Sequence, residues 1–402
     1  MKKISFFLIF LSFLIIINNS FRYYKNKTSY EIGDWLINYQ GGFVRKGLIG
    51  EFFFQIYDFT KLNPSLLVLF LIIFLYFIFY FVVLKLLNKI TFNKLFIFTL
   101  FSPLSFFFPV FNSKATGRKE ILFISILSFL CYFLPKIDKK YYLYIYLLSL
   151  SLIGLTHEGF IFYFGYLLIP LILLLRPNNI NEIKIIGFCI LFLTISLLLL
   201  TYNFSGTEQH VISICNSIKQ FANERCETFG QIAALKWDLN RYITEKNDIY
   251  LPKYIFLYSS YAIISFAPLF LMHKYASLKI FIFNTRFSLI LLLIVPFVLT
   301  LPIYYIAFDW GRYLHTSYIS SLIILLFLIK NKMILFNYKI NIQKYNFINK
   351  IILPIFFITY CFGWTVPYCC KPEIKSGLFR SIKLGISYYE RNGFTLPKYF
   401  YK

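Results

Sequence analysis

Long apolar runs separated by short polar segments dominate the pattern of this chain. An α-helix needs about 20 predominantly apolar residues to cross a bilayer, and several of the runs approach or exceed that length. The pattern therefore predicts an all-α fold, a polytopic transmembrane helical bundle of about eleven spans. The predicted spans lie at residues 4–17, 65–87, 95–111, 121–135, 141–156, 160–175, 185–202, 254–272, 287–308, 313–329 and 351–367.

The first of these runs resembles a signal peptide, because the basic residues Lys2 and Lys3 precede it. The polar exit at residues 18–22 lacks a small-residue cleavage site. We therefore expect an uncleaved anchor helix, slightly short for a full span, with the N-terminus in the cytoplasm.

Composition shows why lipid must surround these helices. Of the 402 residues, 59% are hydrophobic and 14% are charged, whereas soluble proteins average about 45–50% and about 25%. A net charge of +24 would indicate nucleic-acid binding in a soluble protein, but lysines in short cytoplasmic loops ordinarily set membrane orientation. We expect membrane lipids, and no nucleic acid, among the partners.

Alternation of the spans from a cytoplasmic N-terminus sorts the loops into two sets. The inner loops are short and rich in lysine, with Asp138 and Glu182 as their only carboxylates, as the positive-inside rule requires. This arrangement predicts a multi-pass protein of the bacterial inner (plasma) membrane with an outer C-terminal tail. The unusual polar clusters then fall on the outer, periplasmic face, at residues 34–51, 114–120, 157–159, 203–253 and 309–312.

The first outer loop, residues 19–64, contains the most informative segment, residues 33–51. Large apolar residues are mixed with charges there, as in a helix that lies in the membrane interface. Arg45 and Lys46 suit phosphate binding by charge-assisted hydrogen bonds, and Asp34 suits proton abstraction from a substrate. The alternative is an amphipathic connector whose basic residues contact lipid headgroups.

The second outer loop has three basic residues, Lys114, Arg118 and Lys119, which run against the positive-inside bias; anion binding explains their placement better than a snorkelling rim does. Arg312 suits a second phosphate ligand oriented by Asp309. The alternative for Arg312 is a self-neutralising ion pair with Asp309. The alternative for Glu120 is a favourable interaction with the dipole of the helix that it begins. For His157 and Glu158 the alternative is a polar helix cap. Supporting roles in the site are predicted for Gly41, Gly42, Glu51, Glu120, His157, Glu158 and Asp309.

The long outer loop, residues 203–253, contains two of the seven cysteines, Cys215 and Cys226. They form a disulfide if the loop faces an oxidising compartment. Trp237 and Asp238 in the same loop suit stacking on a sugar ring, although most of the loop has the composition of ordinary solvated surface.

The layout resembles the GT-C superfamily of membrane glycosyltransferases, which place an essential carboxylate in the first outer loop. Asp34 occupies that position, the cluster at residues 118–120 corresponds to the second outer loop, and residues 203–253 correspond to the longer loop after the seventh span. The resemblance covers residues 1–255 as a GT-C-like transmembrane module, and residues 256–402 add further transmembrane helices and the outer tail.

The strings GGFVRKGLIGE, GRKE, THEG and DWGR also resemble multi-spanning proteins of bacterial surface-polysaccharide clusters, including Wzy-type polymerases. These resemblances imply glycosyl transfer from a polyprenyl-(di)phosphate-linked donor to a saccharide acceptor, as repeat-unit polymerisation in O-antigen or capsule synthesis. The alternatives are a decorating glycosyltransferase, a flippase or exporter of lipid-linked oligosaccharides, and a non-catalytic scaffold. The sequence identifies no definite cofactor. The resemblance allows a divalent metal, but the absence of an Asp-x-Asp sequence from the second loop argues against metal dependence.

Overall fold

The structure is a computed structural model in which most of the chain is helical. Six helices are long and apolar enough to cross a membrane in the described part of the chain. They are α1 (Lys2–Asn26), α3 (Pro64–Leu87), the segment Glu158–Leu175, Lys184–Asn203 within α9 (Ile180–Asn203), Pro252–Leu271 within α12 (Leu251–Leu271), and α15 (Trp310–Lys330). The structure describes residues 2–88, 90–175, 180–227, 230–238, 240–241, 251–278, 281–282, 285–286, 289–336, 351–369 and 375–377.

Shorter helices complete the bundle. They are α4 (Lys94–Leu100), α5 (Phe108–Phe111), α6 (Glu120–Phe133), α7 (Tyr142–Thr156), α8 (Phe164–Leu175), α13 (Leu289–Leu299), α14 (Leu301–Ile306) and α16 (Leu353–Phe362). Antiparallel pairs of very short strands lie in the connections: β1 (Ala276–Leu278) with β4 (Ile334–Phe336), β2 (Phe281–Ile282) with β3 (Thr285–Arg286), and β5 (Trp364–Thr365) with β6 (Lys375–Ser376). A helical protein of membrane character is therefore present, while the number of eleven spans stays a prediction.

Several predicted spans differ from the structure. The predicted span 287–308 is divided into α13 and α14, with Thr300 between them, and within the predicted span 351–367 helix α16 ends at Phe362, before β5. The anchor helix is longer than the predicted residues 4–17, because α1 continues through the polar exit; the Ser20 hydroxyl donates to the Ile16 carbonyl there. The prediction of one helix over residues 95–111 is wrong: α4 ends at Leu100 and α5 begins at Phe108. Pro103 lies between them, and proline cannot donate a helical hydrogen bond.

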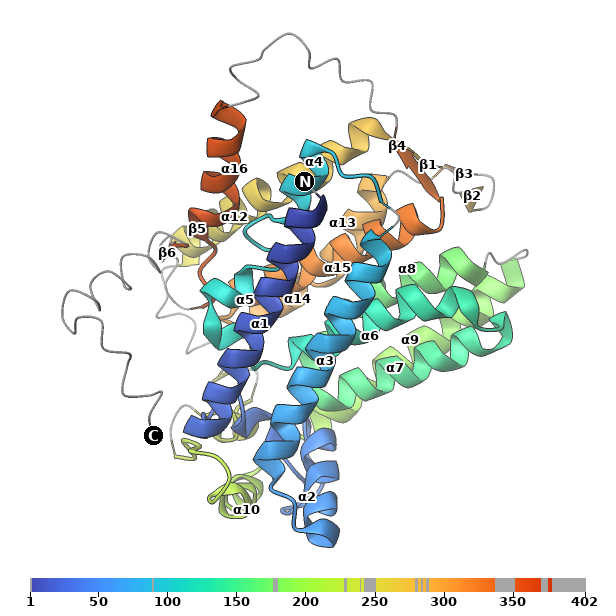
Figure 1. The fold of residues 1–402 in the computed structure, drawn as a ribbon. Helices are drawn as coiled ribbons and strands as arrows, with labels where there is room; N and C mark the ends of the chain where they lie inside the picture. Colours follow the sequence, from blue (N-terminus) through green and yellow to red (C-terminus); the bar gives the residue numbers. More distant parts are fainter. Residues whose placement is uncertain are drawn as a thin grey trace, which may run out of the picture.

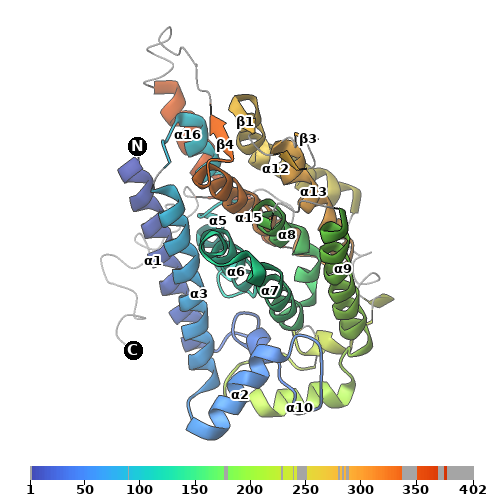
Figure 2. The ribbon, with the colours of Figure 1, turned by 90° about the vertical axis from the view of Figure 1, so that its right-hand side faces the viewer.

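Helix α15 forms the centre of the bundle and packs against α3, α6, α8 and α12 (Figures 1 and 2). Its buried face contains hydroxyl side chains, including Thr316 and Ser320. Two tyrosine hydroxyls connect α15 to its neighbours: the Tyr163 hydroxyl donates to the Tyr313 carbonyl of α15, and the Tyr318 hydroxyl of α15 donates to the Thr99 carbonyl of α4. Small and hydroxyl residues allow such close helix packing within a membrane.

One end of the bundle carries two further helices, α2 (Leu48–Thr60) and α10 (Glu208–Ile218), which lie together at the end opposite the N-terminus (Figures 1 and 2). Helix α2 leaves Phe52 and Phe59 exposed, as the interfacial helix predicted in the first outer loop would. The 3₁₀ helices η1 (Gly33–Leu36), η5 (Glu158–Tyr163) and η6 (Ala233–Lys236) also belong to this end, which we call the loop end. Residues 378–402, the predicted outer tail, lie outside the described residues.

Gly50 is required where α2 meets the first loop. A Cβ atom at position 50 would lie 1.9 Å from the Ile37 carbonyl oxygen, whereas one at Gly187 in α9 would meet nothing within 4 Å. We expect Gly50→Ala to lower the free energy of unfolding by about 1–3 kcal/mol, the usual cost of overpacking, and Gly187→Ala to be neutral or slightly stabilising. Thermal unfolding of both variants in detergent measures this, and equal melting temperatures would contradict the contact at Gly50.

Candidate functional site: a buried charge cluster

Four segments that are far apart in the sequence meet at the loop end. They are the first loop, the start of α6, the end of α7 with the start of η5, and the start of α15. Their charged side chains form ion pairs with one another, and we call them the charge cluster. The charge cluster consists of Asp34, Arg45, Lys46, Arg118, Lys119, Glu120, Glu158, Asp309 and Arg312.

The innermost pair of the cluster joins Asp34 and Lys119. The Lys119 ammonium lies 3.5 Å from an Asp34 carboxylate oxygen, and the two side chains are 0% and 1% exposed. The same ammonium donates to the carbonyl oxygens of Lys46 and Thr156, each at 3.2 Å. Burial alone would raise the pKa of Asp34, but the charges of Lys119 and Arg118 outweigh it and hold that pKa well below its usual range.

A second group links the start of α6 to the start of α15. The Arg312 guanidinium lies 2.7 Å from Glu120 and 3.1 Å from Asp309, and Arg118 lies 4.0 Å from the same Asp309 oxygen. Glu120 and both arginines are at most 6% exposed, whereas the Asp309 side chain is 21% exposed. Arg118 also donates to the Tyr30 carbonyl, so this group holds the first loop too.

The third group joins the first loop to η5. Lys46 lies 3.1 Å and Arg45 3.9 Å from one oxygen of Glu158, whose side chain is 24% exposed. Arg45 is fixed by the long outer loop, because its guanidinium donates to the Leu235 carbonyl and its backbone N–H donates to the Phe204 carbonyl. Lys46 adopts a φ of +67°, a conformation that costs a non-glycine residue energy and persists where surrounding contacts impose it.

The structure therefore brings together every predicted phosphate-binding residue, the predicted base and three of the predicted supporting carboxylates. Their roles stay predictions. Each cation of the charge cluster, however, already faces a carboxylate of the same chain. The cluster holds five cations and four carboxylates, so its formal charge is 5 − 4 = +1. An anionic ligand would have to compete with these internal partners.

Three predicted supporting residues have other surroundings. A Cβ atom at Gly41 would lie 2.9 Å from the backbone of His210, and Gly42 has a positive φ of +111°. The atoms that closely approach these two glycines therefore belong to helix α10. Glu51 accepts a hydrogen bond from the Tyr39 backbone N–H at 2.9 Å. Glu51 and the two glycines shape the first loop without an ion pair to the charge cluster among the described residues.

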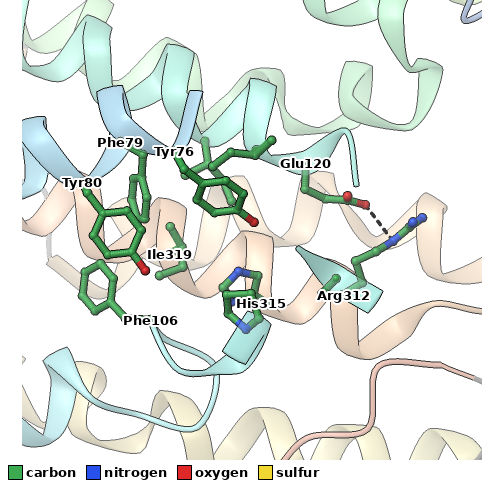
Figure 3. Close-up of a pocket in the computed structure, with 12 residues that line it drawn as sticks. Tyr76, Phe79, Tyr80, Phe106, Glu120, Arg312, His315 and Ile319 are labelled. Atoms are coloured by element: carbon green, nitrogen blue, oxygen red, sulfur yellow. Dashed lines mark ion pairs between the residues drawn. The ribbon is translucent and has the colours of Figure 1, made fainter. Parts of the chain in front are cut away.

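A small cavity of about 20 Å³ lies beside the cluster, between α3, α6 and α15 (Figure 3). Glu120 and Arg312 line it together with aromatic side chains, among them Tyr76 and His315. This volume suits about one water molecule. Sequence reasoning missed His315 because residues 313–329 were treated as an ordinary span; the polar residues repeated along that span were the available signal.

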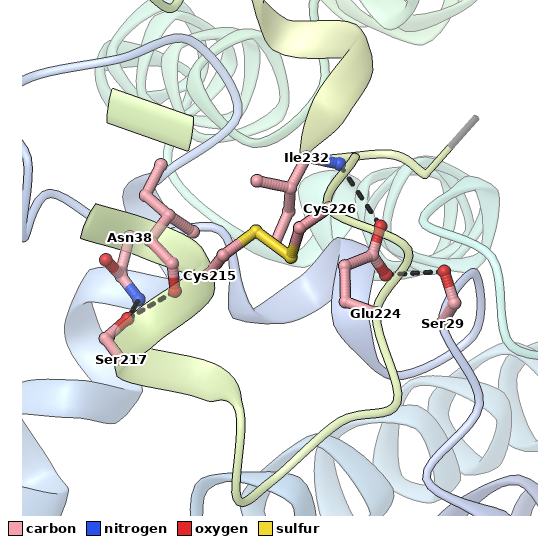
Figure 4. The surroundings of a disulfide bond; sticks show 8 residues. Ser29, Asn38, Cys215, Ser217, Glu224, Cys226 and Ile232 are labelled. Atoms are coloured by element: carbon pink, nitrogen blue, oxygen red, sulfur yellow. Dashed lines mark hydrogen bonds between the residues drawn. A yellow bond between two sulfur atoms is a disulfide. The ribbon is translucent and has the colours of Figure 1, made fainter. Parts of the chain in front are cut away.

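A disulfide between Cys215 and Cys226 fastens α10 to the segment that follows it (Figure 4), which is the pairing predicted for an oxidising compartment. Next to it, Glu224 accepts hydrogen bonds from the Ser29 hydroxyl and the Ile232 N–H. Burial raises the pKa of Glu224 to about 6. The long loop is therefore attached to the first loop at several points, and it covers the charge cluster from the side of Arg45.

Among the described residues, no three His, Cys, Asp or Glu side chains lie together in a way that could hold a metal ion. His157, which precedes Glu158, is 6% exposed, and its Nδ1 atom accepts a hydrogen bond from the Gly159 N–H at 3.2 Å. Burial, together with the positive charge of Lys46, lowers the pKa of His157 to about 3. His157 is therefore a neutral imidazole beside the charge cluster at physiological pH.

The neutral state of His157 predicts a loss of stability in acid. Its folded pKa lies below the unfolded value, so the unfolded chain binds more protons, and stability falls as pH drops below about 6.5. Each pH unit in that window contributes about 1.4 kcal/mol at most. We expect His157→Gln to show a smaller fall in melting temperature between pH 7 and pH 5 than the wild type. The control His210→Gln should keep the wild-type fall, and identical profiles for all three proteins would contradict burial of a neutral His157.

Comparisons with known proteins add no family to this description. No family model, no curated protein and no solved structure matches this chain. The functional conclusion therefore depends on the residues of the loop end and on their surroundings.

Proposed function

We propose that this protein transfers a glycosyl group from a polyprenyl-(di)phosphate-linked donor to a saccharide acceptor at the outer face of the membrane. The observation that carries the proposal is the charge cluster, which has more cations than carboxylates and lies at one end of a set of apolar, membrane-length helices. A lipid-linked donor combines an apolar tail with an anionic (di)phosphate. The apolar helices suit the tail of such a molecule, and the surplus cations suit its phosphate.

The chemistry requires stabilisation of a departing phosphate. When the bond between the anomeric carbon and the phosphate oxygen breaks, negative charge grows on that oxygen, and fixed cations in a water-poor site stabilise it strongly. Arg45 and Lys46 are the least buried cations of the cluster, with side chains 12% and 9% exposed. Positioning of donor and acceptor in one site would supply much of the remaining acceleration.

The disulfide supports an outer location for the loop end. Disulfides persist in oxidising compartments such as the bacterial periplasm, and Cys215–Cys226 lies in the loop that packs on Arg45. Repeat-unit polymerisation in surface polysaccharide synthesis is the form of the reaction we propose. A decorating transferase would use the same site with a donor that carries one sugar.

A flippase is the main alternative, because it would also bind a lipid phosphate. A flippase moves its substrate across the bilayer, so it needs polar or charged groups along the whole path. The ion pairs of the charge cluster are confined to the loop end of the helices that form it. Purified protein in proteoliposomes with lipid-linked donor and acceptor separates the two functions, because only a transferase forms a new glycosidic bond.

Lys46 provides a direct test of donor binding. Lys46→Gln shortens the side chain by one atom and keeps a hydrogen-bond donor, but removes the charge next to Glu158. We expect the KM for the lipid-linked donor to rise at least tenfold, because a charge-assisted contact to phosphate is lost, with a melting temperature close to that of the wild type. The control is Lys219→Gln, an exposed lysine at the end of α10, which should leave KM unchanged. Equal KM values for both variants would refute phosphate binding at Lys46.

The outer location is tested with two exposed lysines at opposite ends of the helices, Lys61 after α2 and Lys140 between α6 and α7. We expect a membrane-impermeant maleimide to label Lys61→Cys in intact cells and to label Lys140→Cys only after permeabilisation. The reverse pattern would place the charge cluster in the cytoplasm and exclude a periplasmic reaction.

A further inference from the structure

We infer that Glu158 is the carboxylate that receives the proton of the acceptor hydroxyl, and that Asp34 is a positioning residue held by Lys119. This inference rests on the proposed function and deepens it, because it assigns the reacting group within the charge cluster. It also changes the role predicted for Asp34, the carboxylate that the layout of the first outer loop singles out.

Accessibility separates the four carboxylates of the cluster. Asp34 and Glu120 have side chains that are 1% and 6% exposed, so neither is open to an acceptor sugar. Asp309 and Glu158 have side chains that are 21% and 24% exposed. A general base must come within hydrogen-bond reach of the hydroxyl it deprotonates. Asp309 and Glu158 are therefore the two candidates. The Oε2 atom of Glu158 is buried and has no hydrogen-bond partner among the described residues, and its Oε1 atom faces Lys46 and Arg45, so an acceptor hydroxyl reaches this carboxylate only when those cations are drawn to another anion.

Charge balance distinguishes Glu158 from Asp309. Asp309 belongs to the group Arg118, Asp309, Arg312 and Glu120, which contains two cations and two carboxylates and is neutral. The buried pair of Asp34 and Lys119 is neutral as well. Among the ion pairs of the described residues, the surplus positive charge of the cluster therefore lies with Arg45 and Lys46, which both face Glu158.

This surplus places the donor phosphate next to Glu158. A phosphate that binds Lys46 and Arg45 competes with Glu158 for them, and its negative charge raises the proton affinity of that carboxylate. Asp309 has no comparable change, because one of its oxygens is shared by two guanidinium groups that are at most 4% exposed. Donor binding thus converts Glu158 from an ion-pair partner into a base at the position where the acceptor must approach.

Lys119 explains why Asp34 still matters. Its ammonium holds the Lys46 carbonyl of the first loop and the Thr156 carbonyl at the end of α7, two residues before Glu158. Asp34 neutralises that ammonium inside the protein. The pair therefore fixes the distance between the cation Lys46 and the carboxylate Glu158, and neither member touches the substrate.

The step is a single displacement. The acceptor oxygen forms a bond to the anomeric carbon of the donor, and the bond between that carbon and the phosphate oxygen breaks. The electron pair of the broken bond leaves with the lipid (di)phosphate, whose charge Lys46 and Arg45 stabilise. The hydroxyl proton passes to the Glu158 carboxylate, which later releases it to solvent. No electrons are exchanged with another reactant.

The assignment of the base is tested with Glu158→Gln and Asp309→Asn in the proteoliposome assay. We expect Glu158→Gln to lower kcat at least 100-fold, the usual contribution of a positioned base, with an unchanged or lower KM for the donor and a melting temperature near that of the wild type. Asp309→Asn should retain more than a tenth of the wild-type kcat. A folded Glu158→Gln variant with kcat within tenfold of wild type would overturn the inference, as would loss of turnover in Asp309→Asn alone.

The positioning role of Asp34 is tested by restoring charge balance. Asp34→Asn leaves Lys119 charged and unneutralised, so both melting temperature and kcat should fall. In the double variant Asp34→Asn/Lys119→Gln, a neutral pair replaces the ion pair, and the glutamine amide still has N–H donors for the two carbonyls. We expect the double variant to be at least tenfold more active than Asp34→Asn and to keep the wild-type pH profile. A stable double variant as inactive as the single one would show that Asp34 is itself the base.

These outcomes are distinct from failure of the proposed function. If the wild-type protein forms no glycosidic bond with lipid-linked donors, the proposed function fails, and the inference about Glu158 fails with it. The role of the Asp34–Lys119 pair is still decided by melting temperatures, which require no substrate. If the wild type is active but Glu158→Gln is too, only the inference is wrong.

Discussion

The ammonium of Lys119 is the interaction on which the loop end depends. It is fully buried, and it contacts the Asp34 carboxylate and two backbone carbonyls from separate segments. Removing a charge from water costs several kcal/mol, and only good geometry and further hydrogen bonds offset that cost. Loss of one partner leaves an uncompensated charge, so the pair acts as an all-or-none connection between the first loop and the end of α7. The position of Lys46 relative to Glu158 follows from this connection.

The membrane-length helices explain why such a polar cluster can form next to lipid. Helix α15 is buried among its neighbours, and its first turn brings Arg312 to the charges that flank α6. Ion pairs at helix ends lie where the apolar part of each helix stops. They are therefore surrounded by neighbouring loops rather than by lipid hydrocarbon. The long outer loop contributes the rest of the cover, since it is bonded to the first loop at Arg45 and at Ser29. The disulfide between Cys215 and Cys226 reduces the part of that loop that is not held in place by a covalent bond.

Hydropathy could predict the long helices because about 20 apolar residues are a local signal, and α3 and α15 lie close to their predicted positions. It could not predict the break between α4 and α5, since Pro103 lies inside an apolar run and acts through backbone geometry. Alternation of spans correctly gathered Asp34, Lys46 and Arg312 at one end of the bundle. The pairing among them depends on how helices from distant parts of the chain pack. For the same reason the sequence did not reveal that the neighbour of Gly41 is α10 rather than a ligand.

The most exposed side chains of the charge cluster are the carboxylates Glu158 and Asp309, and its cations are more deeply buried. In the substrate-free protein the cations are already neutralised, so a weakly charged anion gains little by displacing a carboxylate that is fixed in place. A lipid (di)phosphate carries more charge than a carboxylate, and its apolar tail confines it to the membrane beside the loop end, which raises its local concentration. Selectivity for phosphate would then come from competition with Glu158 rather than from an open positive pocket. Under the proposed function, the same competition would release Glu158 for proton transfer only when a donor is bound, which would couple the reactive state of the site to occupancy by its substrate.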